Sequence, residues 1–478
     1  MTPTPSGPSP ANPLELDPET MRRLGHLVVD LLVARIASLD ADAAWRGATR
    51  AELEPRLREP PPERPGDFER LLDRVVREVL EYAGRIDHPR FLAFIPSCPT
   101  WPGILGDLLA SGFNVFQGTW LESSGPSQLE LVVLDWFKDW LGYPPEAAGL
   151  LVSGASAANL IALVCAREAL LGGPSADAVI YYSTETHSSV ERAARIAGFT
   201  PDQIRTLPAD GSFRLPLDAL RRAVDDDARA GRRPFLIVAN AGATSTGAID
   251  PFTALADFCA ERRLWLHADA AYGGFAVLTE RGRAWLDGIG RADSITLDPH
   301  KWLYQPYEVG CLLVRGGARL RDAFHIMPDY LQDTAVGGGE VNFADRGLQL
   351  TRAARVLKIW LSLQAFGVAA FRRAIDRALD LTLEAQRRIE RAAAFELLAP
   401  AALGVVCFRR RVPGGDEPAH ERANAALVQG LNRSGLGMIS STRVRGRYAL
   451  RLCIMNHRTT LGDVERVIHW LESEPLSG

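Results

Sequence analysis

A lysine follows a strand-like run, at a place where a primary amine could do chemistry. Lys301 lies in the stretch Asp298-Pro299-His300-Lys301-Trp302, directly after the run 294–297. If that run is a strand, the lysine lies at the carboxyl edge of a sheet, where we expect burial to lower its pKa and free the amine to attack an aldehyde. An isolated lysine is more often a solvated surface charge. His300 and Trp302 lie in an apolar stretch, however, which argues against a plain solvated loop.

Lysine is rare in this chain. Nearly all of its 54 basic residues are arginines, and only Lys138, Lys301 and Lys358 are lysines. A guanidinium group does not condense with an aldehyde, so a chain that carries its charge on arginine would keep a lysine where an amine is required. The alternative is that all three lysines are chance survivors.

A carboxylate follows a second strand-like run. Asp269 lies in His267-Ala268-Asp269-Ala270-Ala271-Tyr272, after the apolar residues 264–266. A carboxylate there could pair with a protonated pyridine nitrogen and keep the ring an electron sink, and the small neighbours would leave room for a flat ring. A strand-end aspartate is more often a helix cap or a turn residue. The lysine at the next strand end favours the chemical interpretation.

Two further segments follow strand-like runs. Ser153-Gly154-Ala155-Ser156-Ala157-Ala158-Asn159 comes after 150–152 and opens a helix. Free backbone amides and a hydroxyl at a helix N-terminus suit a phosphate, although serine followed by small residues begins many helices. His187 comes just after 180–182, where an imidazole could stack on a planar cofactor and exchange protons near neutral pH. A lone histidine is usually structural or exposed.

Short β-rich runs alternate with helical segments from about residue 150 to residue 315, and these elements must position the residues above. Such alternation predicts an α/β fold with right-handed crossovers and a mostly parallel sheet covered on both faces. Ligands gather at the carboxyl ends of the strands in such sheets. The predicted strands are 178–182, 235–239, 264–267, 294–297 and 311–314, and the clearest helices between them are 157–171 and 251–263.

Helical segments flank this region on both sides. Residues 18–39 carry an apolar face at helical spacing, and a proline-rich stretch at 59–65 separates them from a second helix at 68–82. Beyond Gly367 we expect a long helix to about residue 393, strands at 404–409 and 448–453, and a closing helix at 461–471. We therefore predict three parts: an N-terminal helical segment (1–85), a large domain (86–366) and a small C-terminal α+β domain (367–478).

Composition excludes several classes of partner. A formal charge of -4 gives no excess positive field to hold a nucleic acid, so we expect none. The six cysteines lie far apart without metal-ligand spacing, which indicates reduced thiols and no metal site. The opening residues 1–13 lack the pattern of a signal peptide, and no apolar run is long enough to span a membrane. We expect a cytoplasmic protein that does not bind membranes.

Six motifs together resemble one known family. SGASAAN, THSSVERA, HADAAYGG and DPHKW occur in this order, and HPRFLAFIPS near residue 88 and WLESSGPSQLE near residue 120 precede them. The set resembles the group II pyridoxal-phosphate-dependent decarboxylases, most of all the aromatic-L-amino-acid decarboxylases, from about residue 14 to residue 472. The resemblance implies the aspartate-aminotransferase-like fold (fold type I) with a seven-stranded, mostly parallel sheet, and pyridoxal 5'-phosphate as cofactor.

The resemblance also implies roles for individual residues. Lys301 would bind the cofactor aldehyde with His300 beside it, Asp269 would hold the pyridine nitrogen, and His187 would stack on the ring. The further cofactor contacts would be Ala271 on the other ring face, Ala155 and Ser156 at the phosphate, Thr244 in support and Asp298 near the phosphate. Tyr330, in Met327-Pro328-Asp329-Tyr330-Leu331, would protonate the carbanion left by loss of CO2.

The resemblance leaves the substrate open. Phe94, Pro96 and Trp120 match positions that line the side-chain pocket in the family, and an apolar wall suits a ring, although core packing would explain them equally well. Two positions depart from the family's pattern: Asp298 stands where the family often has Asn, and Thr351 stands where aromatic-specific relatives usually have Gly or Ser, which obscures the choice between indole and phenol substrates. Asp also occurs at the first position in branches that act on diamino acids.

We therefore expect decarboxylation of an L-amino acid, and an aromatic one (tyrosine, dopa, tryptophan or phenylalanine) in particular, to the amine and CO2. One alternative keeps the cofactor but yields an aldehyde by oxidative deamination, or takes a diamino or acidic substrate. Relatives that make aldehydes replace either the stacking histidine or the loop tyrosine, and His187 and Tyr330 are both present here. A non-catalytic scaffold is the alternative from another class. A shared fold would also imply a homodimer, with each active site completed at the subunit interface.

Overall fold

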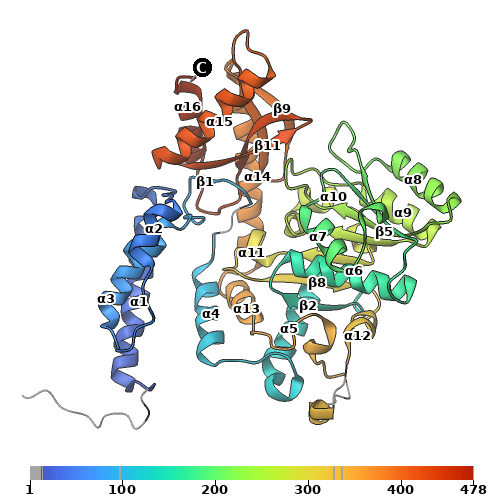
Figure 1. Ribbon diagram of the computed structural model, residues 1–478, viewed down its shortest axis with the longest axis horizontal. Coiled ribbons are helices and arrows are strands. Elements are labelled where there is room, and N and C mark those ends of the chain that lie inside the picture. The colour runs from blue at the N-terminus through green and yellow to red at the C-terminus, as the bar shows by residue number, and fades with distance from the viewer. Residues whose placement is uncertain are drawn as a thin grey trace, which may run out of the picture.

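The computed structural model of the chain describes Asn12 and residues 14–95, 98–326, 329–334, 337 and 339–476. The side chains of Tyr330 and Leu331 lie outside this description. Two sheets organise the molecule, a seven-stranded sheet in its middle part and a five-stranded sheet formed mainly by the C-terminal part (Figure 1).

The seven-stranded sheet carries the edge at which the chemical residues were predicted. Its strands pair in parallel except for β8, which runs antiparallel to both of its neighbours. The predicted mostly parallel sheet of seven strands is therefore confirmed. In order across the sheet the strands are β2 (Ala148–Val152), β8 (Gly310–Val314), β7 (Ser294–Leu297), β6 (Trp265–Asp269), β5 (Arg233–Asn240), β3 (Ala178–Ser183) and β4 (Ile204–Leu207).

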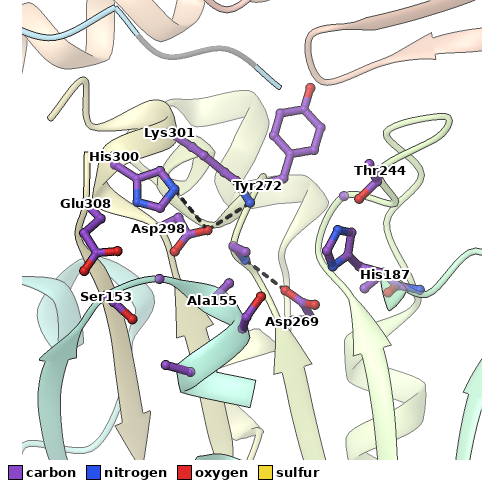
Figure 2. Close-up of a pocket in the computed structure, with 16 residues that line it drawn as sticks. Ser153, Ala155, His187, Thr244, Asp269, Tyr272, Asp298, His300, Lys301 and Glu308 are labelled. Carbon is purple, nitrogen blue, oxygen red and sulfur yellow. Dashed lines mark hydrogen bonds and ion pairs between the residues drawn. The ribbon is translucent and has the colours of Figure 1, made fainter. Parts of the chain in front are cut away.

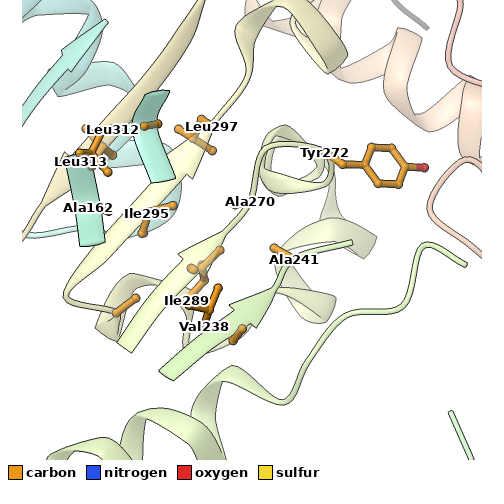
Figure 3. Packing of buried hydrophobic residues seen from close by; sticks show 14 of the residues in the cluster. Ala162, Val238, Ala241, Ala270, Tyr272, Ile289, Ile295, Leu297, Leu312 and Leu313 are labelled. Atoms are coloured by element: carbon orange, nitrogen blue, oxygen red, sulfur yellow. The ribbon is translucent and has the colours of Figure 1, made fainter. Parts of the chain in front are cut away.

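Continuous apolar runs form the central strands because both faces of this sheet are covered. In β5 every residue from Phe235 to Asn240 is buried. Figure 3 shows Ile295 and Leu297 of β7 beside Leu312 and Leu313 of β8, within one cluster of buried apolar residues. Full burial of each Leu or Ile side chain contributes about 1.5–3 kcal/mol. This rigid core fixes the strand ends on which the candidate site is built.

Helices cover both faces of the sheet. α6 (Ala155–Leu171) packs on β5 to β8 and against α7 (Ser188–Ile196). The connections through α8 (Leu217–Arg229) and α9 (Phe252–Arg262) run along the sheet in the opposite direction to the connection through α7, so right-handed crossovers place them on the other face. The remaining elements of this region are α4 (Trp101–Gly112), α5 (Trp120–Leu141), η4 (Pro201–Gln203), η5 (Gly274–Leu278), α10 (Glu280–Trp285), η6 (Ile289–Arg291), α11 (Pro299–Trp302), α12 (Arg319–Phe324), η7 (Asp329–Thr334), η8 (Phe343–Arg346) and α13 (Val356–Phe366).

The five-stranded sheet joins distant parts of the chain. Its strands, in order, are β1 (Phe91–Leu92), β11 (Met438–Val444), β12 (Arg447–Cys453), β10 (Val405–Arg410) and β9 (Phe395–Ala402). The helices of this part are α14 (Val368–Arg391), α15 (Glu417–Ser434) and α16 (Leu461–Ser473). A separate apolar cluster fills the space between them and includes Leu92 of β1. The predicted small α+β unit is therefore present, and a short segment near residue 91 pairs with it.

The N-terminal helices stand beside the rest of the molecule (Figure 1). They are α1 (Pro18–Ser38), η1 (Leu39–Ala41), α2 (Arg50–Leu57), α3 (Phe68–Arg74), η2 (Val75–Val79) and η3 (Leu80–Tyr82). Asp17 caps α1 by accepting from the amides of Glu19 and Thr20. No residue of α1, α2 or α3 is buried, although apolar side chains occupy one face of α1. We name these helices, residues 18–82, the N-terminal arm.

Three further expectations from the sequence concern the domain boundaries, the cysteines and membrane-spanning helices. The division of the chain at residues 85 and 366 stays a prediction. All six cysteines are buried and free of disulfide bonds. Within the ranges given above, every helix is too short or too polar to pass through a lipid bilayer.

A buried ion pair ties the segment after η8 to the large sheet. Arg352 and Glu130 are 2 % and 0 % exposed, and Arg352 Nη2 lies 2.7 Å from Glu130 Oε1. The same arginine donates to the carbonyls of Gln117 and Leu151, while Glu130 accepts from the Leu151 amide. Removing one partner would leave the other charge buried without compensation.

We expect Glu130→Ala to lower the free energy of unfolding by about 3–5 kcal/mol, because the Arg352 charge then stays buried and unpaired. Urea denaturation at a fixed protein concentration measures this loss. Glu191→Ala is the control: Glu191 pairs with Arg195 on the exposed surface, where such a pair contributes less than about 1 kcal/mol. Equal losses in the two variants would contradict the prediction.

Candidate active site

One cavity of about 360 Å³ lies at the carboxyl ends of β5, β6 and β7 and at the N-terminus of α6 (Figure 2). Its volume falls within the usual range for small-molecule sites. Nine of the predicted cofactor residues line it together: Ala155, Ser156, His187, Thr244, Asp269, Ala271, Asp298, His300 and Lys301. The structure thus brings together residues that are up to about 150 positions apart in the sequence.

Lys301 points into this cavity from the short helix α11, which begins directly after β7. Pro299 occupies the first helical position, where a missing backbone N–H costs nothing. The Lys301 amine lies 2.9 Å from Asp298 Oδ2, and Figure 2 shows both groups facing each other across the turn.

The expectation of a lowered pKa for Lys301 is wrong. Burial lowers its pKa, but the negative charge and hydrogen bond of Asp298 and the charge of Asp269 together outweigh burial, so the pKa of Lys301 is raised. Desolvation alone would lower this pKa, but the Asp298 carboxylate lies one helical turn away. A free Lys301 amine is therefore held as an ammonium ion near neutral pH.

His300 stands beside the lysine and contacts the same carboxylate. Its Nε2 atom lies 3.6 Å from Asp298 Oδ2, and its Nδ1 atom accepts from the Val309 amide. Burial lowers the pKa of His300, against the opposing charge of Asp298. The other carboxylate oxygen, Asp298 Oδ1, is buried and has no hydrogen-bond partner in the described part of the chain.

Asp269 ends β6 at the floor of the cavity. Its Oδ1 atom accepts from the Ala271 amide at 3.2 Å, and its Oδ2 atom accepts from the Asn159 side chain at 3.1 Å. The side chains of Ala270 and Ala271 beside it are small and buried. This arrangement presents a fixed carboxylate with open space above it.

His187 lies on the opposite side of the cavity from Lys301, close to Thr244 and Asp269 (Figure 2). It precedes α7, and its Nδ1 atom accepts from the amide of Ser189 and lies 2.8 Å from the Ser189 hydroxyl. Burial lowers the pKa of His187, with Asp269 acting in the opposite direction. The imidazole is therefore neutral at physiological pH.

The N-terminus of α6 offers free backbone amides. No side chain caps this helix, and its first internal bonds are donated by Ala157 and Ala158 to the Gly154 carbonyl. The start of β8 lies against this turn because Gly310 has no side chain: a Cβ there would be 2.5 Å from Gly154 Cα. Unpaired amides at the end of a 17-residue helix suit an anion.

The C-terminal part of the chain supports the loop that carries Thr244. Arg451 of β12 donates to the Thr244 carbonyl at 2.5 Å, and Cys407 of β10 donates to the Ser245 carbonyl at 3.1 Å. Arg451 also donates to Ser440, whose hydroxyl accepts from the Phe94 amide. The packing of the small sheet therefore fixes one wall of the cavity.

Some predicted residues are not part of this cavity. Phe94 is 59 % exposed with a φ of 57°, and Trp120 is the first residue of α5; neither lines the cavity of this chain. Pro96 and the side chain of Tyr330 lie outside the described residues, so their roles stay predictions.

The sequence interpretation missed several lining residues. Asn240 is the last residue of β5, so it could have been predicted from the tendency of ligands to bind at the carboxyl ends of strands. Glu308 comes seven residues after Lys301 in a loop, and no motif indicated it. Ser153, Gly154, Ala157 and Tyr272 lie within quoted motifs but were given no role, and Gly242 comes two residues before Thr244.

A comparison with protein families decides what kind of site this is. Residues 51–411 match the family described as the pyridoxal-dependent decarboxylase conserved domain. The chain belongs to this family. The predicted resemblance, the carboxy-lyase class and pyridoxal 5'-phosphate as cofactor are confirmed.

Individual relatives match over nearly the full length of the chain. An aromatic-L-amino-acid decarboxylase of Bacillus atrophaeus is 41% identical, covering 95% of this chain and 95% of its own. A phenylacetaldehyde synthase of Arabidopsis thaliana is 30% identical, covering 92% of each chain. The crystal structure of Oryza sativa TDC with PLP and tryptamine superposes with a TM-score of 0.91 at 30% identity, covering 96% of this chain and 98% of that one. These relatives share the fold and the family.

The residues present fit pyridoxal 5'-phosphate. An aldehyde needs a nearby amine, a pyridine nitrogen needs an anion, and a phosphate needs free donors. Lys301, Asp269 and the uncapped amides of α6 supply these three features around one cavity. The carboxylate of Asp298 would repel a phosphate, but its bond to Lys301 directs one of its oxygens to the amine.

Proposed function

We propose that this decarboxylase converts an aromatic L-amino acid to the corresponding amine and CO2. The observation that carries the proposal is the convergence of Lys301, Asp269 and His187 on one cavity. The aromatic substrate is supported by the name of the Bacillus atrophaeus relative, which is an aromatic-L-amino-acid decarboxylase at 41% identity.

The predicted cofactor residues have proposed tasks. Lys301 would bind the cofactor aldehyde through its amine. To become a free amine, the Lys301 ammonium would first give one proton to Asp298 Oδ2 or to His300. Asp269 holds the pyridine nitrogen protonated, supported by the amide of Ala271 and the side chain of Asn159. His187 and Ala271 would hold the ring, and the amides of Ala155 and Ser156 would hold the phosphate.

Bound pyridoxal 5'-phosphate supplies an electron sink that stabilises the charge left on the α-carbon when CO2 departs. The protein supplies the rest. Asp269 keeps the pyridine ring protonated, His187 excludes water from one face, and Tyr330 donates the proton that the α-carbon takes up. The Lys301 amine would hold the cofactor again once the product has left.

Aldehyde formation is the second candidate, because a phenylacetaldehyde synthase is among the relatives. That outcome consumes oxygen and releases ammonia and peroxide besides CO2. His187 lines the cavity and Tyr330 is present in the sequence, and both features support simple decarboxylation.

A panel of amino acids given to the cofactor-loaded protein tests the proposal. We expect CO2 and amine in equal amounts from tyrosine, dopa, tryptophan or phenylalanine, without ammonia or peroxide. Glutamate, 2,4-diaminobutyrate and lysine are the matched substrates of other classes. Turnover confined to these three would overturn the aromatic assignment, and peroxide with ammonia from an aromatic substrate would establish the aldehyde-forming outcome.

We further propose that two chains form a homodimer through the N-terminal arm and that each active site is completed at the interface. Met21 and Val33 of α1 are 53 % and 51 % exposed, and Leu71, Val75 and Val79 are also exposed on the arm. An apolar helix that buries no residue in its own chain needs a partner surface. A second copy of the same arm is self-complementary under two-fold symmetry.

Placing charge on that face should weaken the dimer. Met21 and Val28 lie seven residues apart on one face of α1, and we expect Met21→Glu with Val28→Glu to raise the dimer dissociation constant at least about tenfold, because the carboxylates would be buried in the interface. Sedimentation equilibrium measures the constant. Arg22→Glu, on a neighbouring polar face, should leave it unchanged. A monomeric wild-type protein would refute the arm as an interface.

We propose a cytoplasmic location, where thiols stay reduced. The six buried, unpaired cysteines support it.

A further inference from the structure

A set of hydrogen-bonded side chains lies behind the cavity and connects Asp269 to His187. Its members are Trp265 and His267 of β6, Ser294 of β7, Asn159 of α6 and Ser189 of α7. All five are buried. None of them lines the cavity, and the proposed function above uses only Asn159, as a support for Asp269. The donor and the acceptor of each of these hydrogen bonds can be assigned by starting from Trp265 or from Asp269.

The first end is an indole, which can only donate. Trp265 Nε1 donates to the Ser294 hydroxyl oxygen at 2.8 Å. The hydroxyl proton of Ser294 is then free to donate to His267 Nδ1, also at 2.8 Å. A neutral His267 whose Nδ1 accepts must carry its proton on Nε2. Burial lowers the pKa of His267 to about 4, so the ring is neutral under working conditions.

The second end is the carboxylate of Asp269, which can only accept. Asn159 donates from Nδ2 to Asp269 Oδ2 at 3.1 Å, because a flipped amide would place its oxygen against the carboxylate. Asn159 Oδ1 therefore faces His267 Nε2 at 3.0 Å and must accept from it. The Thr296 hydroxyl is a more distant neighbour of the same nitrogen, at 3.5 Å. Both ends thus assign the proton of His267 to Nε2.

The remaining branch reaches His187. Asn159 Nδ2 donates its second proton to the Ser189 hydroxyl oxygen at 3.0 Å. Ser189 then donates its own hydroxyl proton to His187 Nδ1 at 2.8 Å, next to the bond from its amide. With Nδ1 accepting twice, a neutral His187 carries its proton on Nε2. Within the described residues that atom has no hydrogen-bond partner.

We propose that Asn159 is a positioning residue that orients the Asp269 carboxylate and, through Ser189, fixes His187 as the Nε2–H tautomer. Asn159 donates one amide proton to Asp269 and the other to Ser189, and its side-chain oxygen accepts from His267. What the tautomer does for catalysis depends on the proposed function: an N–H at Nε2 can donate to a substrate carboxylate or pass a proton, whereas a bare Nε2 could not. The charged groups that face His187 are Asp269, Lys301, Asp298 and Arg192.

The tautomers can be read directly by long-range 1H–15N correlation spectra of protein labelled with 15N-histidine, with and without cofactor. We expect His187 and His267 to show a protonated Nε2 and an unprotonated Nδ1 at neutral pH. A His187→Gln sample assigns the His187 signals. A protonated Nδ1 on His187 in the wild-type protein would overturn the proposal, and this result needs no variant to fold.

Two variants separate the branches. Ser189→Ala removes the hydroxyl donor to His187 Nδ1 and keeps the amide donor, so we expect a shifted Nδ1 signal and a larger Nδ1-protonated population at His187 than in the wild type, with His267 unchanged. Asn159→Asp keeps the volume but removes both donated protons, so we expect changes at both rings and cofactor affinity weakened on the order of tenfold, measured by fluorescence titration. Ser362→Ala, another buried helical serine, is the control and should leave both rings unchanged.

Identical His187 spectra for Ser189→Ala and Ser362→Ala would also overturn the proposal. The outcome is independent of the proposed function, because the tautomers are measured without turnover. An inactive protein with the expected tautomers would count against the proposed substrate and not against the role of Asn159.

Discussion

Lys301→Arg should abolish amine formation, with kcat at least on the order of 10³-fold below the wild type, because a guanidinium group does not condense with an aldehyde. The substitution keeps the positive charge and its partner Asp298, so the cavity should keep its shape. Steady-state assays of amine release measure the loss. Lys138→Arg is the control, since Lys138 pairs with Asp135 and donates to the backbone carbonyls of Pro145 and Ala147, away from the cavity.

Borohydride reduction locates the same bond without any substitution. The chain has three lysines, so the reduced cofactor can reside on only three peptides. We expect the label on the peptide that contains Lys301. A label on the peptide of Lys358, or activity retained by Lys301→Arg, would refute the assignment.

Asp269→Asn is expected to lower kcat about 10²- to 10³-fold, because a neutral amide cannot hold the pyridine nitrogen charged. The new side-chain amide would also face the Nδ2 group of Asn159, 3.1 Å from the present Oδ2. Single-turnover kinetics should place the loss in the step that releases CO2 and not in substrate binding.

Asp227→Asn provides the comparison for this variant. Asp227 is equally buried and accepts from Tyr181 and Arg205, but it lies on α8 away from the cavity. It should keep the wild-type rate even if its stability falls. Equal losses of rate in the two variants would show that Asp269 acts through stability alone.

The large sheet could be predicted because its strands are short, apolar and separated by clear helices. The runs at 235–239, 294–297 and 311–314 each fall within a strand of the structure. Burial on both faces makes such strands continuous apolar runs, a pattern that needs no knowledge of their neighbours. The residues at their carboxyl ends follow from the same pattern, which is why Lys301 and Asp269 were found.

The remaining structure depends on contacts between distant residues. The two-residue strand β1 exists because it pairs with β11, almost 350 positions later, and no local pattern marks it. β9 contains Pro400, and its apolar and polar residues do not alternate as they do in a half-buried strand. No strand was therefore predicted there. The raised pKa of Lys301 has a local cause, the orientation of the Asp298 side chain toward the amine, which the residue types alone do not determine.

The scarcity of lysine also governs how this protein responds to amine-directed reagents. The side chains of Lys138 and Lys358 are only 9 % and 3 % exposed, while that of Lys301 is 23 % exposed. An acylating reagent small enough to enter the cavity therefore finds one accessible ε-amine per chain. Alkaline buffer is needed to deprotonate this amine, because its pKa is raised. Coupling to an amine-reactive support through a lysine would engage Lys301 in the candidate site, so immobilisation is better directed to another functional group.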